Sequence, residues 1–413
     1  MIYQQFRLVE TLENTLILGR NMSETIREFD GSAPLLGNPQ RWSKIIGPVL
    51  LSRVEFAKLL AMILVVSPFF GLPGIFFLFC MHVLSILRVG SDSEEKHGIS
   101  TLPSSRLGGL AIAIMMFAYV GFTFFGASEP LVLNYTERSG WIAVLFMAAL
   151  GLSEDLKADL LSPLVRLAAQ FLFMGGILFI ADAYIPSSLG VPGLDLLMAL
   201  PLVSWLLCTV FAVGFINAFN MADGANGLIP GIAFAAFFVF ASETGRMFEV
   251  GYMSACAIFL VFNVISGRFF LGDMGSYGLG AAVVLYGLWF VSEGTMSLAF
   301  LACLLAYPCL DLLMSIGRRI SDGRSAFSPD NDHLHNSLFR QIRRRVDSPV
   351  LANSLTGLLI SGFTSGVTVL GYLQAWWSLS SNDWWVLFAV QAVLYLVVYW
   401  VTGLGRALVS NKF

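Results

Sequence analysis

The chain has 413 residues, of which 57% are hydrophobic and only 12% are charged, with a net charge of −3. A soluble domain carries about 25% charged residues, so this composition excludes a soluble globular protein and predicts a polytopic membrane protein. We expect no nucleic-acid partner, and the 5 cysteines, all inside apolar segments, indicate neither a disulfide framework nor a zinc site.

A partly amphipathic N-terminal extension, 1–55, precedes the first apolar stretch, 56–88. That stretch is either one long kinked span or two short arms that turn at Pro68, Gly71, Pro73 and Gly74. Ten later apolar segments are long enough, or nearly so, to cross a bilayer as helices: 107–126, 141–152, 164–183, 199–216, 228–241, 250–265, 279–291, 296–316, 351–373 and 384–404. We therefore expect an all-α membrane protein of about 10–11 transmembrane helices over 56–404, with a short tail at 405–413.

The loops between these segments alternate between the two sides of the membrane. One side holds 89–106, 153–163, 217–227, 266–278 and 317–350. From Arg88 onward, this side and the tail carry fifteen Lys and Arg residues, and the other side carries only Arg138 and Arg246. Because Lys and Arg gather in cytoplasmic loops, we expect the five loops and any site they form to face the cytoplasm. The six Lys and Arg residues in 1–55 favour a hairpin for 56–88, whereas the usual single crossing favours one span.

Each of the five loops contains a polar cluster. In chain order they read "EEKHGISTLPSSRLGG", "GLSEDLKADLLSPLVRLAAQ", "NAFNMADGANGL", "GRFFLGDMGSYGLG" and "DGRSAFSPDNDHLHNSLFRQ". Taken singly, several of their residues have a simple structural explanation as a helix-end pair, a helix cap, an Asx turn or loop histidines. Those residues are Glu154, Asp155, Asp223, Asn226, Asp273, His333 and His335.

Taken together, the clusters favour a catalytic site. Carboxylate and amide oxygens suit Mg²⁺, Arg and Lys neutralise phosphate, and glycines let backbone N–H groups approach anionic oxygens. This combination is typical of phosphoryl transfer, where positioning and charge stabilisation supply most of the catalysis. A transporter or flippase of lipid-linked sugars is the alternative, but transporters place polar groups near the middle of the bilayer, and here the middles of the spans are nearly bare.

The motifs resemble those of the polyprenyl-phosphate N-acetylhexosamine-1-phosphate transferases over about residues 95–340. "NAFNMADGANGL" is similar to the family's N-x-x-N-x-x-D-G-x-[DN]-G-L, and "FLGDMGS" is similar to F-x-G-D-x-G-S. "SAFSPDNDHLHN" resembles S-P-F-x-P-D-x-x-H-x-H-H, and "EDLKADLLSPLVRL" resembles the segment with paired aspartates. All five clusters match in order.

The resemblance implies transfer of a sugar-1-phosphate, of N-acetylhexosamine type, from a UDP-sugar to undecaprenyl phosphate, with release of UMP. It implies Mg²⁺ as the cofactor, with Mn²⁺ as the alternative, and a multi-pass protein of the bacterial inner membrane in contact with membrane lipids. Homodimers occur in this family, so a homodimer is a further partner to consider.

The resemblance also implies roles for the residues around the metal and the nucleotide. Asn220 and Asp273 would contact the metal. Asn226, with Asp223 nearby, would face the uracil or the metal shell, since an Asn side chain offers both a donor and an acceptor to the mixed edge of uracil.

Further roles concern the two phosphates and the sugar. Lys157 and Arg166 would hold the lipid phosphate, and Asp155 with Glu154 would order that phosphate or take its proton. The other residues assigned to the site are His333 and His335, at the pyrophosphate or the sugar, and His97, Arg106, Asn217, Ser276 and Asp330, which would bind substrate.

Three positions depart from the family pattern. Glu154 stands in place of the first of two paired aspartates, Asn226 stands where many bacterial members have Asp, and Asn336 replaces the last histidine of the His cluster. None of these changes removes an expected metal ligand. Residues 1–55 have no counterpart in the family pattern.

Overall fold

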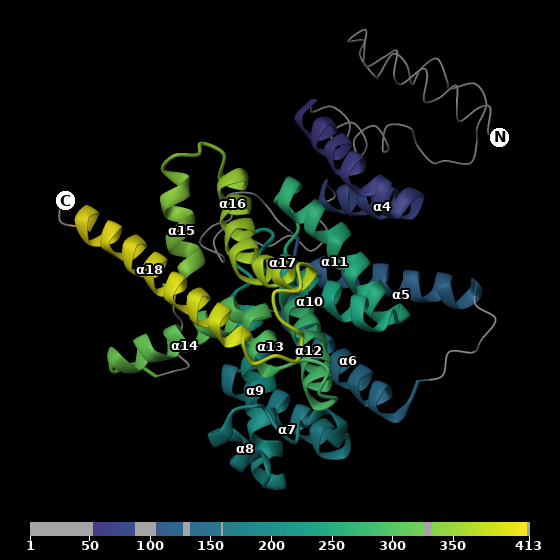
Figure 1. Cartoon of the computed structure of the whole chain (residues 1–413). Coiled ribbons are helices and arrows are strands. Elements are labelled where there is room, and N and C mark those ends of the chain that lie inside the picture. The colour runs from purple at the N-terminus through teal and green to yellow at the C-terminus, as the bar shows by residue number, and fades with distance from the viewer. Residues whose placement is uncertain (1–52, 87–104, 127–132, 158–159, 326–331, 411–413) are drawn as a thin grey trace.

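The computed structural model of the chain describes residues 53–86, 105–126, 133–157, 160–325 and 332–410 (Figure 1). Most of the N-terminal extension, most of the loop 89–106 and residues 411–413 lie outside the described residues. Within the described ranges the longer helices are α4 (Arg53–Ile86), α5 (Gly108–Gly126), α6 (Tyr135–Leu156), α7 (Pro163–Ile180), α9 (Pro201–Met221), α10 (Leu228–Thr244), α11 (Met247–Ser266), α12 (Gly272–Ser292), α14 (Ala306–Ser321), α15 (Leu334–Arg343), α16 (Pro349–Ser361) and α18 (Trp384–Ser410). Short helical segments are η1 (Asp182–Tyr184), α8 (Pro192–Met198), α13 (Leu298–Leu304), η2 (Gly362–Gly366) and α17 (Val367–Leu373).

The expectation of an all-α, polytopic membrane protein is confirmed. In the described part of the chain, 9 helices are long and apolar enough to cross a membrane, or up to 10 if the bent pair α13 and α14 forms one span. Each predicted apolar segment is helical, although 296–316 is divided between α13 and α14, and 351–373 between α16, η2 and α17. The elements extend into the flanking polar turns, as expected for the short segments: α6 reaches Leu156 and α12 begins at Gly272.

The apolar stretch 296–316 is not one continuous helix, because α13 and α14 meet at an angle of 81°; the pair forms either a broken span or a re-entrant loop. Pro308 explains the break, since its ring clashes with the carbonyl of residue 304 and it has no N–H to donate there. The hydroxyl of Ser365 donates a hydrogen bond of 2.6 Å to that carbonyl, on Leu304. The break is therefore stabilised by a partner from η2.

The stretch 56–88 forms α4, which is bent at Gly71. Gly71 has φ 53° and ψ −145°, a conformation that glycine adopts readily. The two arms of α4 run in different directions on either side of this residue (Figure 1). A bend near Gly71 is common to both alternatives for this stretch, the kinked span and the hairpin.

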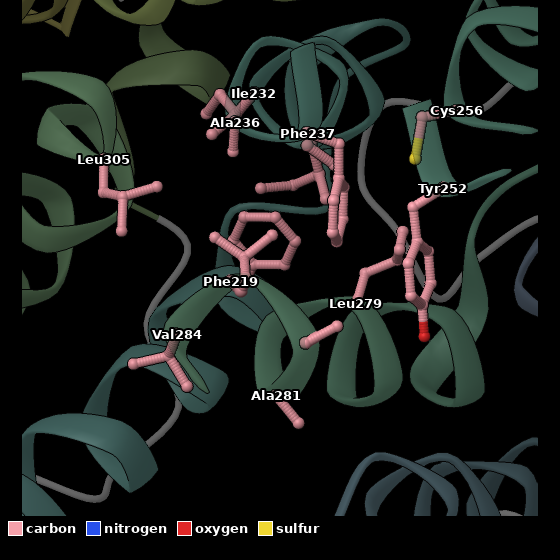
Figure 2. Close-up of a cluster of buried hydrophobic side chains, with 14 of the residues drawn as sticks. Phe219, Ile232, Ala236, Phe237, Tyr252, Cys256, Leu279, Ala281, Val284 and Leu305 are labelled. Atoms are coloured by element: carbon pink, nitrogen blue, oxygen red, sulfur yellow. The ribbon is translucent and has the colours of Figure 1, made fainter. Parts of the chain in front are cut away.

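Helix α12 lies at the centre of the bundle and packs against α5, α6, α9 and α10 (Figure 1). In the most apolar 18-residue stretch of α12, 83% of the residues are buried, whereas the corresponding share in α18 is 17%. Helix α12 is therefore enclosed by protein, and α18 is not. Figure 2 shows Leu279, Ala281 and Val284 of α12 among Phe219 of α9 and Phe237 of α10. The first turn of α12 is therefore held by a rigid surrounding core.

Small residues bring the start of α12 unusually close to α5 and α6. A Cβ atom on Gly109 of α5 would lie 2.3 Å from the Cα atom of Gly275, and one on Gly278 would lie 3.1 Å from the Cβ atom of Ala148 in α6. Such close approach of backbones is how helices pack in membranes, where apolar side chains gain little by leaving lipid.

We predict that Gly109→Ala destabilises the protein, because the added methyl group meets backbone atoms of Gly275 that cannot rotate away. Overpacking of this kind costs about 1–3 kcal/mol. Gly121→Ala, in the same helix, is the matched control, since a Cβ atom there has nothing within 4 Å. Thermal unfolding in detergent should show a lower midpoint for Gly109→Ala alone; equal midpoints for the two variants would contradict this packing.

Candidate active site

Side chains from the ends of α6, α9 and α12 meet at one end of the bundle, and Asp155 provides the central connection. Asp155, near the end of α6, accepts a hydrogen bond on each carboxylate oxygen: one of 3.0 Å from the backbone N–H of Asp273 and one of 2.8 Å from that of Met274. These N–H groups belong to the first turn of α12 and have no partner within the helix. A carboxylate also interacts favourably with the positive N-terminal end of the helix dipole. Asp155 therefore fixes where Asp273 lies.

Asn220, at the end of α9, joins the same turn of α12. Its amide nitrogen donates a hydrogen bond of 2.7 Å to Oδ1 of Asp273 and another of 2.7 Å to the hydroxyl of Ser276. Since the amide nitrogen is used in this way, the amide oxygen is the atom of Asn220 that would bind a cation.

Asp223 lies in the turn after α9, close to the two other carboxylates. Its pKa is raised to about 8, first by burial and then by the negative charges of Asp273 and Asp155. Arg106 and a hydrogen bond from the backbone of Gly272 oppose this rise. With a pKa of about 8, Asp223 is mainly protonated at pH 7 when no cation is bound.

The backbone before α5 is joined to the backbone before α12. The N–H groups of Ser105, Gly108 and Gly109 donate to the carbonyl oxygens of Arg268, Phe270 and Leu271 at 2.8–3.0 Å, and the N–H of Phe270 donates to the carbonyl of Ser105 at 2.9 Å. This pairing places Arg106 near Asp155 and Asp223, where its positive charge favours the ionised form of both carboxyl groups.

Position 272 requires a glycine, because the backbone of Arg106 packs directly against it. Gly272 has φ 72°, and a Cβ atom there would lie 2.3 Å from the carbonyl oxygen of Arg106 and 2.8 Å from a carboxylate oxygen of Asp155. Any other residue would separate the two loops.

Glu154 faces away from the three carboxylates. It is 4% exposed. Its carboxylate forms an ion pair of 3.3 Å with Arg166 at the start of α7 and accepts a hydrogen bond of 3.0 Å from the N–H of Leu161. Lys157 lies exposed at the end of α6. The pair Glu154–Arg166 therefore ties α6 to α7 beside the site.

Asn217 contacts a partner that the sequence did not suggest. Its amide nitrogen donates to Oε1 of Gln170 at 2.7 Å and to the carbonyl of Val213 at 2.8 Å. Gln170 is fully buried in α7, one turn after Arg166. Asn217 thus links α9 to the helix that carries Arg166.

Asn226 is buried against α16 and makes its contacts with protein. It is 2% exposed, its N–H donates to Oδ1 of Asn353 at 2.8 Å, and its amide nitrogen donates to the hydroxyl of Ser354 at 3.3 Å. These bonds anchor the turn 222–227, and a contact between Asn226 and the base stays a prediction.

Asn263 of α11 supports the same turn. It accepts a hydrogen bond of 2.6 Å from the N–H of Gly227 and donates one of 2.6 Å to the carbonyl of Phe269. One buried amide therefore holds the third and fourth polar loops together.

The two histidines are oriented by buried groups of α14. Nδ1 of His333 lies 2.6 Å from Oδ2 of Asp311, and Oδ1 of Asp311 accepts from the N–H of Leu334 at 3.1 Å and from the hydroxyl of Tyr395 at 2.8 Å. Asp311 is 2% exposed. The ring of His333 stacks on that of His335 with 5.3 Å between the centroids.

His335 connects the His cluster to the turn after α9. Its Nδ1 lies 2.8 Å from the hydroxyl of Tyr307, and that hydroxyl also accepts from the backbone N–H of His335. A Cβ atom on Gly224 would lie within 3 Å of Nε2 of His335, so this nitrogen faces the turn. The pKa of His335 is lowered to about 4, chiefly by burial; the charge of Asp311 opposes this shift, and His333 and Arg340 add to it. His335 is therefore neutral at pH 7.

The donor chemistry fits a hard divalent cation. Asp223 and Asp273 offer carboxylate oxygens, and Asn220 offers an amide oxygen, the ligand types that Mg²⁺ prefers. A bound cation would lower the pKa of Asp223, which burial and, after it, the charges of Asp273 and Asp155 raise. In the ranges that the structure describes, no group of three or more His, Cys, Asp or Glu side chains is arranged so that it could hold a metal ion.

The sequence-based set of site residues is thus only partly gathered in one place. One group of predicted site residues does lie together: Asp155, Asn220, Asp223, Asp273 and Ser276. Arg106 lies beside this group. His335 lies against Gly224, the residue that follows Asp223. His97 and Asp330 lie outside the described residues. The sequence analysis missed Asp311, Asn263 and Gln170. Each of these residues is a single carboxylate or amide within an apolar span, and the sequence could have indicated them for that reason. Burial of such a group in a membrane costs free energy, so its presence indicates a functional role or a polar partner.

Comparisons with known proteins agree with this arrangement. Residues 138–291 match the sequence model of glycosyl transferase family 4, a range that includes Asp155, Asn220, Asp223 and Asp273 but not the two histidines. Decaprenyl-phosphate N-acetylglucosaminephosphotransferase of Mycobacterium tuberculosis is 28% identical over 292 residues, which cover 61% of this chain and 70% of that protein.

Two further relatives match shorter ranges. Phospho-N-acetylmuramoyl-pentapeptide-transferase of Anoxybacillus flavithermus is 29% identical over 51% of this chain and 64% of that protein. Undecaprenyl-phosphate alpha-N-acetylglucosaminyl 1-phosphate transferase of Thermotoga maritima is 32% identical over 32% of this chain and 42% of that protein.

The fold and the site define a polytopic α-helical membrane protein with carboxylate, amide and histidine side chains gathered at one end of its helices. Within that class, the motifs and the matches support one family: the chain is similar to the polyprenyl-phosphate N-acetylhexosamine-1-phosphate transferases.

We predict that Asp311→Ala destabilises the protein more than Tyr395→Phe does. The first change removes the acceptor of three buried donors, and each unsatisfied buried group costs about 1–3 kcal/mol. The second removes one donor and leaves the bonds from His333 and Leu334. Thermal unfolding in detergent should rank wild type above Tyr395→Phe and Tyr395→Phe above Asp311→Ala; the opposite order of the two variants would contradict this role of Asp311.

Proposed function

We infer that the chain is a membrane-bound transferase that moves a sugar-1-phosphate onto a polyprenyl phosphate, the kind of reaction for which its relatives are named. We propose further that the donor is a UDP-sugar of N-acetylhexosamine type and that the acceptor is undecaprenyl phosphate. The observation that carries the proposal is the junction of Asp155, Asn220 and Asp273, which places hard oxygen donors where two helices end. A flippase is not favoured, because these groups lie at the ends of the helices.

The proposed reaction is a displacement at phosphorus. An oxygen of the lipid phosphate attacks the β-phosphorus of the UDP-sugar, the bond from that phosphorus to the bridging oxygen breaks, and UMP leaves. The products are UMP and a lipid diphosphate that carries the sugar. Catalysis of this kind depends on alignment and on offsetting charge at the phosphoryl oxygens.

A divalent cation, when bound, would supply charge compensation at the pyrophosphate. Mg²⁺ is the proposed ion, and Asp273 and Asn220 are the residues proposed to hold it. Asp155 acts as a positioning residue, because both of its oxygens already hold the first turn of α12 in place.

Cationic and neutral groups would hold the two substrates. Arg166, kept in place by Glu154, lies at the start of α7 and would bind the lipid phosphate, with Lys157 nearby. His335 is neutral at pH 7, so it would donate a hydrogen bond through Nε2 to the pyrophosphate or the sugar and would not act as a cation.

We predict that Asp273→Asn abolishes transfer and leaves the fold intact. The amide keeps the shape of the side chain but lacks the charge that a hard cation requires. Purified wild type should release UMP from a UDP-sugar only when a divalent cation and polyprenyl phosphate are both present. Retention of more than about a tenth of wild-type turnover in Asp273→Asn, a loss below ~1.4 kcal/mol, would refute the assignment. Glu293→Gln, an exposed carboxylate at the far end of α12, is the matched control.

We propose that the site faces the cytoplasm of the bacterial inner membrane, on the support of the fifteen Lys and Arg residues on its side against two on the other. In a background without the native cysteines, Ser321→Cys, at the end of α14, should resist an impermeant thiol reagent in intact cells and react once the membrane is opened. Ser242→Cys, at the opposite end of α10, should label in intact cells. Both serines are exposed. The reverse pattern would place the site outside and rule out a cytoplasmic sugar donor.

A further inference from the structure

A cavity lies at the opposite end of the same helices that build the candidate active site. Its walls come from the start of α6, the start of α11, the end of α12 and Tyr184 of η1, whereas the active-site groups lie at the end of α6 and the start of α12. The space between its walls is about 600 Å³, a volume that includes open solvent at the surface. The residues of α12 that line the cavity, Ala282 to Trp289, follow Asp273 by 9 to 16 positions, so the two sites are separated by about 14–24 Å along the helix.

The cavity contains a buried carboxylate with an unused oxygen. Glu249, in the first turn of α11, is 1% exposed, and within the described part of the chain no group donates a hydrogen bond to its Oε2. A buried carboxylate oxygen without a donor is costly. The side chain therefore favours a ligand that brings a donor and a positive charge.

The one cationic residue in the described walls of the cavity is already engaged. Nη1 of Arg246 lies 3.0 Å from Oε1 of Glu137, and the guanidinium lies over the ring of Trp289, 5.2 Å from its centroid. Arg246 attracts Glu249 as well. Two carboxylates, Glu137 and Glu249, share this one cation, so the cavity has one unbalanced negative charge when both are ionised.

Aromatic faces surround this charge. The rings of Trp141 and Tyr252 are nearly parallel, with 5.7 Å between their centroids, and Trp141 also lies 4.9 Å from Phe248. Tyr286 and Trp289 complete the walls. Aromatic faces attract cations, and a carboxylate within such walls is the usual setting for recognition of an organic ammonium group. The position of Arg246 over Trp289 is an example within the same cavity.

We propose that this cavity binds a small organic ammonium group, with Glu249 as its counter-ion and the rings of Trp141 and Trp289 as its walls. The group is either the headgroup of an ethanolamine lipid or a free primary amine. Both present the same –NH₃⁺ on a short carbon chain, and the cavity lies where the helices end. This site is separate from the transfer site, so its existence does not depend on the proposed reaction.

The test uses the purified full chain in detergent. Ethylammonium chloride is titrated while thermal unfolding is followed, with NaCl holding the ionic strength constant and ethanol as the neutral analogue of similar size. In a second arm, native mass spectrometry compares retention of phosphatidylethanolamine with that of phosphatidylglycerol of the same acyl chains. Both arms are run on wild type, Glu249→Gln and Glu293→Gln, an exposed carboxylate at the same end of α12.

Ethylammonium should raise the unfolding midpoint of wild type saturably, and ethanol should not. Glu249→Gln should need about tenfold or more ligand for the same shift, because the charged hydrogen bond is lost, and Glu293→Gln should behave as wild type. Glu249-dependent retention of phosphatidylethanolamine identifies the lipid as the source, and an effect confined to the soluble amine identifies a free amine. The proposal is overturned if ethanol stabilises wild type as well as ethylammonium does, or if neither arm depends on Glu249. If Glu249→Gln does not fold, the wild-type comparison of ethylammonium with ethanol decides.

Discussion

The carboxylate of Asp155 joins the end of α6 to the start of α12, and the other groups of the site are positioned relative to that junction. A carboxylate at the C-terminal end of α6 is unfavourable for that helix, whose dipole is negative there. The N-terminus of α12 offsets this cost with two backbone donors. The same contact presents Asp273 to Asn220, so the residue proposed to bind metal is held by α6 through its backbone N–H and by α9 through its carboxylate.

This junction can form only because the backbones approach so closely. Gly151 of α6 would place a Cβ atom about 2 Å from the carbonyl oxygen of Asp273, and Gly109 stands against Gly275. The central position of α12 makes these contacts stiff, since most of its side chains are enclosed. The rigid packing around α12 therefore sets the geometry of the site residues at the start of this helix. No long loop is needed to position them.

Much of this was accessible from the sequence, because hydrophobic length and the spacing of polar loops report directly on helices and on their ends. The helical spans, the gathering of Asp155, Asn220, Asp223 and Asp273, and the turn after α9 were all expected. The break between α13 and α14 was not, because Pro308 within an apolar run is compatible with a kinked span, and the angle depends on the partner that Ser365 provides. Asp311 and Asn263 were missed for a related reason: each acts through a partner far away in the sequence. The burial of Asn226 against α16 likewise depends on Asn353, which no local pattern indicates.

The central claim is that the ends of α6, α9 and α12 form one site for a divalent cation and a sugar-nucleotide diphosphate. The most direct measurement is anomalous diffraction from crystals of the protein grown with Mn²⁺ and a UDP-sugar. The account predicts one strong manganese peak bonded to the carboxylate of Asp273 at about 2.2 Å, with the amide of Asn220 and the diphosphate around it. A peak bonded instead to Glu154, or no peak near Asp273 at saturating Mn²⁺ and bound UDP-sugar, would contradict it.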